Sequence, residues 1–276
     1  MGFKRFCLIL LGLVFWVQSA AAQQCGTCHS TTCPATEVRQ QWNATQLQQC
    51  DMCHRGNPLT SRKNLAHAGM VLPRHSWYVQ PHSAVVEAGE GALKTFACRR
   101  CHVTGEKGND LATNLDAVAP ARSSLELEKA VRDPAVFMPL FPLSDKKLAS
   151  ILTRIYSGAL NAPPSETSRP LVVYFTHAAQ EEDPFTRHCG GCHRMLSHKY
   201  GGLGTDIIGP NLSGMGTEFY PATARDDKAW TRDNLKDWIK NPRKIRPLTT
   251  MPPQKIKEDD VKQVLDIVWP LNSEEK

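Results

Sequence analysis

The chain has 276 residues, of which 41% are hydrophobic and 22% are charged, and its formal net charge is +6. No apolar run reaches the roughly 18 residues that a bilayer-spanning helix needs, so the composition excludes a polytopic membrane protein. The chain is also too apolar to be wholly disordered, while 19 prolines and 18 glycines indicate short helices and many loops.

The first 22 residues have the pattern of a secretory signal peptide. Two basic residues precede a short apolar stretch, and Ala20–Ala22 provides a small-residue cleavage site. A retained membrane anchor is the alternative, but the stretch is short for a transmembrane span. We therefore expect a mature chain that begins near Gln23 and works in the periplasm or on the outer surface of the cell. Loss of the signal also removes one of the 10 cysteines, and the odd number that remains fits poorly with a framework of disulfides.

Eight of the remaining cysteines lie in four copies of the motif Cys-x-x-Cys-His. Two thiols at this spacing can bond to both vinyl groups of one haem, and the histidine that follows can ligate its iron. Zinc sites, iron–sulfur clusters and thioredoxin-type pairs also use Cys-x-x-Cys, but none of them requires this histidine. The motifs therefore predict four covalently bound c-type haems, with thioethers at Cys25 and Cys28, Cys50 and Cys53, Cys98 and Cys101, and Cys189 and Cys192, and with iron bound by His29, His54, His102 and His193.

Helices are expected in a defined order around the third motif. A helix with one apolar side is predicted over residues 85–97, directly before the motif. After the motif, Ser123 and Glu126 have the pattern of a capping box, which predicts the start of a helix that stops before Asp133. A last helix is predicted to begin near Ser144, because the following residues place four apolar side chains on one face: Leu148, Ile151, Leu152 and Ile155.

The fourth motif is followed by helices in the same order. One helix is predicted from about Thr231 to the Asn241-Pro242 pair, and the final helix has an apolar face made of Val261, Val264, Leu265 and Val268. Residues 194–230 are rich in glycine, so we expect loops there, and residues 171–179 are expected to be helical.

These motifs and helices give the chain two resemblances. The chain resembles multihaem c-type cytochromes: residues 83–155 and 183–268 resemble class I cytochrome c domains, and residues 50–69 resemble the compact haem-packing segments of multihaem cytochromes. In that class a methionine sulfur binds the iron opposite the motif histidine, from a loop ahead of the last helix. The resemblance therefore implies that Met138 and Met251 are axial ligands, with packing as their alternative role. Two other methionines compete in the fourth unit but do not lie in that loop: Met195 and Met215.

The first two motifs lie too close together for a haem-wrapping domain between them, because only residues 30–49 separate His29 from Cys50. We expect their two haems to share one small shell, with sixth ligands supplied by the stretch that follows. His67 is the first candidate and His75 the second. Two further residues are held in reserve, His82 and Met70.

The fold class that follows is mainly α. The predicted order is a signal peptide over 1–22, a dihaem N-terminal segment with little regular structure over 23–82, a cytochrome c-like helical domain over 83–156, a linker over 157–170 and a second cytochrome c-like domain over 171–276. The odd cysteine, Cys33, is expected to be a free or capped thiol; an intermolecular bridge and ligation of the first haem are the alternatives.

Electron transfer is the leading function, because six-coordinate irons leave no open site for a substrate. The alternative is a haem-dependent reductase of a small oxyanion or sulfur compound, or a peroxidase, with an open position at the His29 haem. The expected partners are redox proteins: other cytochromes, a membrane quinol-oxidising complex, or an outer-surface cytochrome assembly. Residues 236–257 hold seven Lys or Arg against one acid, which indicates either a solvated face or a docking surface for an acidic redox partner. No basic–aromatic stripe points to nucleic acid.

Overall fold

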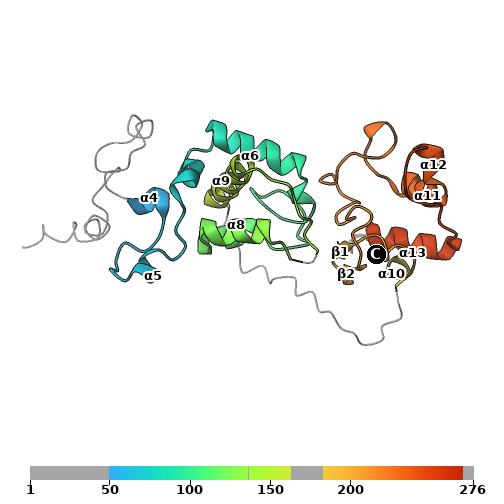
Figure 1. The fold of residues 1–276 in the computed structure, drawn as a ribbon, viewed down its shortest axis with the longest axis horizontal. Coiled ribbons are helices and arrows are strands. Elements are labelled where there is room, and N and C mark those ends of the chain that lie inside the picture. The colour runs from blue at the N-terminus through green and yellow to red at the C-terminus, as the bar shows by residue number, and fades with distance from the viewer. Residues whose placement is uncertain (1–49, 136, 163–182, 270–276) are drawn as a thin grey trace, which may run out of the picture.

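The computed structural model describes residues 50–135, 137–162 and 183–269, which form two helical lobes preceded by a short segment (Figure 1). The described residues are mainly helical, which confirms the predicted fold class. The first motif, Cys33 and the predicted helix at 171–179 lie outside the described residues. Among the residues that are described, no helix is long and apolar enough to cross a membrane.

The described part of the N-terminal segment, residues 50–82, consists of short elements, as expected. Helix α4 (Cys50–His54) carries the second motif, and α5 (Lys63–Ala66) and the 3-10 helix η1 (Pro73–Val79) follow it. The residue after the motif, Arg55, attaches this segment to the first lobe. Its Nη1 donates to the carbonyl oxygen of Ala119 at 2.9 Å, and its guanidinium lies 5.1 Å from the ring centre of Tyr78 and 4.9 Å from that of Tyr156.

The first lobe is built on the crossing of α6 (Ala84–Thr95) with α9 (Asp145–Asn161). Gly89 allows the close approach, since a Cβ there would lie 2.2 Å from the carbonyl oxygen of Ser150. The predicted face of α9 is buried at all four positions: Leu148, Ile151, Leu152 and Ile155. The smaller elements of this lobe are η2 (Cys98–Arg100), α7 (Leu115–Val118), η3 (Ala119–Ala121) and α8 (Ser124–Arg132).

In this lobe the predicted starts of two helices are confirmed. Ser123 and Glu126 form the capping box of α8, and Ser144 caps α9 by accepting from the amide of Lys147. At the other end, α9 continues to Asn161, beyond the expected domain end at residue 156. The helix continues because Ser157 is buried and a Cβ at Gly158 would lie 2.8 Å from the Gly105 amide nitrogen, so these residues pack on the lobe rather than starting the linker.

The second lobe surrounds α13 (Glu258–Val268), which packs against α10 (Pro184–His188) and α11 (Arg232–Lys240). The helix starting after Thr231 is confirmed, with Thr231 as its N-cap, and so is the buried face of α13. Asn241 ends α11, and Pro242 begins the short helix α12 (Pro242–Ile245). A 3-10 turn, η4 (Arg225–Asp227), precedes α11.

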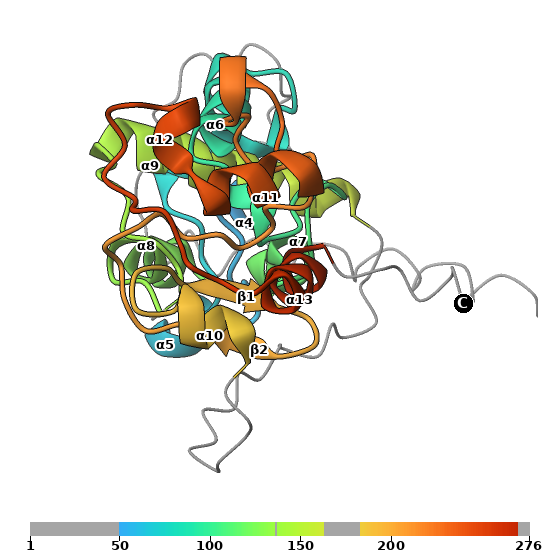
Figure 2. The same ribbon diagram turned by 90° about the vertical axis from the view of Figure 1, so that its right-hand side faces the viewer.

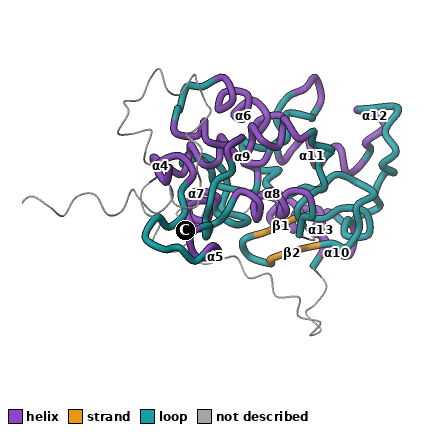
Figure 3. Tube along the Cα trace, turned by 60° about the vertical axis from the view of Figure 1, so that its left-hand side comes forward, coloured by secondary structure: helices purple, strands orange, loops and turns teal. Residues whose placement is uncertain are grey.

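The expectation of loops throughout 194–230 was wrong at one place. Strands β1 (Met195–Ser197) and β2 (Gly201–Leu203) form an antiparallel hairpin that pairs Met195 with Leu203 (Figure 3). The hairpin forms because both of these side chains belong to the second-lobe core, so the pairing buries them together. In Figure 2 the hairpin lies close to α10 and α13.

The two lobes touch through an apolar cluster that contains residues of both: Cys101, Leu111, Phe137 and Leu196. The ring of Phe137 lies against the hairpin, where a Cβ at Gly202 would be 2.3 Å from it. The side-chain amide of Asn211 donates to the carbonyl oxygen of Phe137 at 2.9 Å. The third motif therefore lies at the contact between the lobes.

Candidate haem-binding sites

The three described motif histidines are all held in the same way by a backbone carbonyl. The distance from Nδ1 to the carbonyl oxygen is 3.1 Å for His54 and Val71, 2.7 Å for His102 and Thr113, and 2.8 Å for His193 and Pro210. A carbonyl oxygen only accepts, so each Nδ1 carries the hydrogen and the lone pair lies on Nε2. This is the arrangement of a metal-ligating histidine, whose second nitrogen is fixed by an outer hydrogen bond. Burial also lowers the pKa of His102, which favours the neutral imidazole.

The backbone around the third and fourth motifs makes the same hydrogen bonds twice. In each lobe the second cysteine and the residue after the histidine accept from two amides of the loop that supplies the carbonyl. The bonds run from Ala112 N to Cys101 O (2.9 Å) and Leu115 N to Val103 O (2.9 Å), and from Gly209 N to Cys192 O (2.7 Å) and Leu212 N to Arg194 O (2.8 Å). The two sites are therefore one scaffold in two copies.

A glycine occupies the same place in both copies. Gly108 has a φ of +125° and Gly204 a φ of +77°, and a Cβ at either would lie within about 2 Å of the carbonyl oxygen of the motif histidine (2.1 Å from His102 and 2.0 Å from His193). Only glycine adopts such a conformation at this approach without strain.

Sequence reasoning gave no role to the residues that supply and follow these carbonyls, Pro210 and Asn211 in the fourth site and their counterparts Thr113 and Asn114 in the third. Asn114 accepts from the amide of Asp116 at 2.9 Å, as Asn211 accepts from the amide of Ser213 at 2.9 Å. The signal available in the sequence was the shared Asn-Leu pair, Asn114-Leu115 and Asn211-Leu212.

Three of the four cysteines in the third and fourth motifs have surroundings that disfavour a thiolate. Burial raises the pKa of Cys98 and that of Cys189 to about 11, and it also raises the pKa of Cys101. Redox-active Cys-x-x-Cys pairs need the opposite, a lowered thiol pKa. The environment of these thiols therefore does not suit a thioredoxin-type pair, whereas covalent attachment to haem needs no stabilised thiolate in the finished protein.

Comparison with known families agrees with this geometry. Residues 18–140 match the family model described as outer membrane cytochrome MtrC/MtrF-like, domains II/IV, and residues 182–269 match the cytochrome c family model. The chain is a multihaem c-type cytochrome. It is a haem electron-transfer protein, and its haem is bound covalently. Neither the search of curated proteins nor that of solved structures gave a significant match.

The cytochrome places both expected methionine ligands in loops before the last helix of a lobe. Met138 lies between α8 and α9, and Met251 lies between α12 and α13; both are partly buried. The indole of Trp238 donates to the sulfur of Met251. The two competing methionines are core residues of the second lobe, with 2% exposure for Met195 and 5% for Met215. Ligation by Met138 and Met251 remains a prediction.

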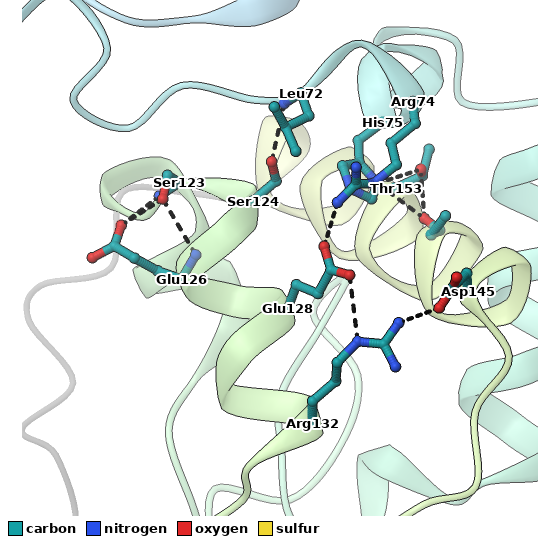
Figure 4. A network of polar contacts seen from close by, with 11 residues as sticks. Leu72, Arg74, His75, Ser123, Ser124, Glu126, Glu128, Arg132, Asp145 and Thr153 are labelled. Carbon is teal, nitrogen blue, oxygen red and sulfur yellow. Dashed lines mark hydrogen bonds and ion pairs between the residues drawn. The ribbon is translucent and has the colours of Figure 1, made fainter.

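The two histidine candidates of the N-terminal segment lie in different surroundings. His67 is the partly buried C-cap of α5. His75 is fully buried against α9, where its Nδ1 contacts the carbonyl oxygen of Ala149 at 3.2 Å and its Nε2 accepts from Arg74 at 3.2 Å (Figure 4). Burial lowers the pKa of His75. To ligate iron, Nε2 of His75 would have to lose its hydrogen bond from Arg74. Ligation by His67 or His75 remains a prediction.

The two reserve candidates differ in exposure. His82 is exposed, and Met70 is partly buried. His75 borders a cavity of about 460 Å³ whose wall combines the apolar Leu148 and Ala149 with four charged side chains, those of Arg74, Glu128, Arg132 and Asp145 (Figure 4).

Exposed apolar side chains next to the sites fit a large apolar cofactor. Ile207 and Ile208 directly precede Gly209, and they are 76% and 77% exposed. Leu248, close to Met251, is 97% exposed, and Leu140, close to Met138, is 73% exposed. Side chains of this kind normally gain from burial, and a porphyrin supplies the apolar surface that can cover them.

Proposed function

We propose that the chain is an exported tetrahaem cytochrome that carries electrons between redox partners. The observation that carries the proposal is the hydrogen bond from Nδ1 to a backbone carbonyl that His54, His102 and His193 share. The first motif, which ends at His29, has the same sequence pattern. Haem supplies a one-electron iron couple when bound. The residues of the chain attach it, orient the imidazoles and exclude water.

The proposed axial ligands set the direction of electron flow. Met138 and Met251 serve the third and fourth sites, and His67 and His75 serve the N-terminal pair. Methionine ligation raises the reduction potential relative to ligation by two histidines. Electrons therefore enter at the N-terminal pair and leave from the fourth site.

Export and association with other cytochromes are supported by two features. Residues 1–22 have the pattern of a signal peptide, and the family matched by residues 18–140 is described as an outer membrane cytochrome. A membrane quinol-oxidising complex or another cytochrome is then the expected donor or acceptor.

The surface around Met251 is proposed as the docking site for an acidic partner. Lys236 and Lys240 pair with Glu258, so their charge is partly balanced. The remaining basic residues of this surface are exposed and lie on either side of Met251 in the sequence: Arg243, Lys244, Arg246, Lys255 and Lys257. An exposed basic surface suits a partner with an acidic one, and the charges would increase the association rate.

The number and ligation of the haems test the proposal. We expect the intact mass of the exported protein to contain four haem additions, and low-temperature EPR to show both His/Met and His/His irons. A mass with fewer additions would overturn the tetrahaem proposal. Carbon monoxide should leave the spectrum of the reduced protein unchanged; a shift would indicate an open site and favour the reductase or peroxidase.

Salt and charge reversal test the docking surface. Lys255→Glu with Lys257→Glu should slow electron transfer to an acidic redox partner by about tenfold at low salt, and the difference should shrink as salt is added. Lys129→Glu with Lys146→Glu, at exposed positions of the first lobe, is the matched control. A wild-type rate in the double variant at low salt would exclude docking at this surface.

A further inference from the structure

The side chain of one arginine in the third motif contacts the second lobe. Arg100 lies between Cys98 and Cys101, and its Nη1 donates to the carbonyl oxygen of Asn211 in the second lobe at 3.0 Å. Its guanidinium also lies 5.6 Å from the ring centre of Tyr220. The neighbouring Arg99 does the opposite, because it is buried in the first lobe and bonded there to Glu90 and Thr104.

The acceptor of this hydrogen bond lies directly beside the fourth site. Asn211 follows Pro210, whose carbonyl oxygen fixes Nδ1 of His193 at 2.8 Å. The path from Cys101 to His193 therefore consists of covalent bonds and two hydrogen bonds, one from Arg100 to Asn211 and one from His193 to Pro210.

Further contacts hold this path in place. Asn109 donates from Nδ2 to the carbonyl oxygen of Arg100 at 3.0 Å and to Oγ1 of Thr217 at 2.8 Å. A Cβ at Gly214 would lie 2.3 Å from the same Arg100 oxygen, so the two backbones are in direct contact. The hydroxyl of Tyr220 is a second donor to the Asn211 carbonyl, at 3.3 Å. Contacts made by both backbone and side chains favour one fixed arrangement of the two sites.

We propose that Arg100 is a positioning residue for electron exchange between the third and fourth haem sites. The proposal rests on the proposed function, since it needs haem at both motifs. With haem at both motifs, the exchange would oxidise one ferrous iron and reduce one ferric iron, with no bond formed or broken and no proton required. Arg100 shortens the path to the fourth site and places a fixed positive charge beside the loop that holds His193.

The test separates the contact from the charge with two variants of the full haem-loaded chain. Arg100→Gln removes both, so flash-injected electrons should move between the two sites about tenfold more slowly, the lower end of the losses that follow changes around the ligands of a metal site. The potential of the fourth site should also fall, because loss of a positive charge favours the ferric state. Arg100→Lys keeps the charge without the planar guanidinium, so the potential should recover and the exchange rate should not. Arg99→Lys, in the same motif but directed into the first lobe, is the matched control.

The outcomes distinguish this inference from the proposed function. If the wild-type mass shows no haem on the third or fourth motif, the proposed function fails. If both sites carry haem and Arg100→Gln has the wild-type exchange rate and potentials, only the present inference is overturned. Should Arg100→Gln fail to mature, Arg100→Lys decides: a slowed exchange with an unchanged potential supports the role, and a wild-type exchange rate removes it.

Discussion

Trp238 donates its indole N–H to the thioether sulfur of Met251, with 3.0 Å between Nε1 and Sδ. A thioether is a weak acceptor, and a hydrogen bond to it withdraws electron density from the sulfur. If Met251 ligates iron, this bond makes the sulfur a weaker donor and so favours the ferrous state.

Trp238→Phe should therefore lower the midpoint potential of the fourth haem and leave the other haems unchanged, as measured by EPR-monitored potentiometry. Trp230→Phe is the matched control, because Trp230 packs edge-on against Trp238 at 5.6 Å but donates to Thr223 instead. Equal potentials in Trp238→Phe and wild type would argue that Met251 is a packing residue.

Gly209 is pressed against the ring of His193, since a Cβ there would lie 2.2 Å from Cε1 and 2.5 Å from Nδ1. Gly209→Ala must therefore displace the imidazole or break its bond to Pro210. We expect the low-spin EPR signal of the fourth haem to be lost or shifted. Gly191→Ala is a strict control, because Gly191 lies inside the same motif but a Cβ there meets nothing within 4 Å. Identical spectra for the two variants would contradict the assigned geometry.

Glu90 bonds two arginines of the first lobe. Hydrogen bonds, chiefly from Arg99 and also from Arg154, lower the pKa of Glu90 from 4.5 to about 2. A carboxylate with a lowered pKa contributes stability that is complete above pH 4.5 and is lost as the pH falls toward 2. Because Glu90 is partly exposed, solvent screening limits this contribution to about 1–2 kcal/mol.

Glu90→Gln should lower the free energy of unfolding by that amount at pH 7, and the difference from wild type should shrink as the pH approaches 2. Urea denaturation at a series of pH values measures both effects. Glu87→Gln, on an exposed position of the same helix, serves as the control. A difference that grows toward low pH would have the wrong sign for this ion pair.

Arg55 joins the second haem motif to the first lobe through Ala119 and the rings of Tyr78 and Tyr156. Cation–π contacts of this kind contribute about 0.5–2 kcal/mol, so Arg55→Gln should destabilise the docked segment by about that much. The expected result is faster proteolysis between residues 55 and 83, with the helical content retained. Arg62→Gln, at an exposed position of the same segment, should be cleaved at the wild-type rate.

The parts of the fold that the sequence predicted are those with local signals. Capping residues at Ser123, Ser144 and Thr231 marked helix starts, because the side chain that satisfies a helix N-terminus lies next to it in the chain. The motif histidines were equally predictable, because each directly follows the second cysteine of its motif.

The parts that sequence reasoning missed depend on backbone groups or distant contacts. Any residue can offer a carbonyl, so the residue type of Thr113 did not mark it as the acceptor for His102, and only the Asn114-Leu115 pair that follows it could have done so. The strands of the hairpin have three residues each, too few to show an alternating pattern. Arg100 and Asn211 are 111 positions apart, and neither residue type indicates the other.

The two copies of the haem-binding scaffold differ most in the length of the connection between the motif histidine and the carbonyl that holds it. The carbonyl that holds His102 comes 11 positions later, and the one that holds His193 comes 17 positions later. The longer connection contains the hairpin, on which the ring of Phe137 rests. The hairpin of the later copy therefore serves both lobes, because Met195 and Leu203 lie in the second core while Gly202 meets the ring of Phe137 from the first. The additional residues of the longer connection thus add one more contact between the lobes to those that Arg100 and Asn211 make.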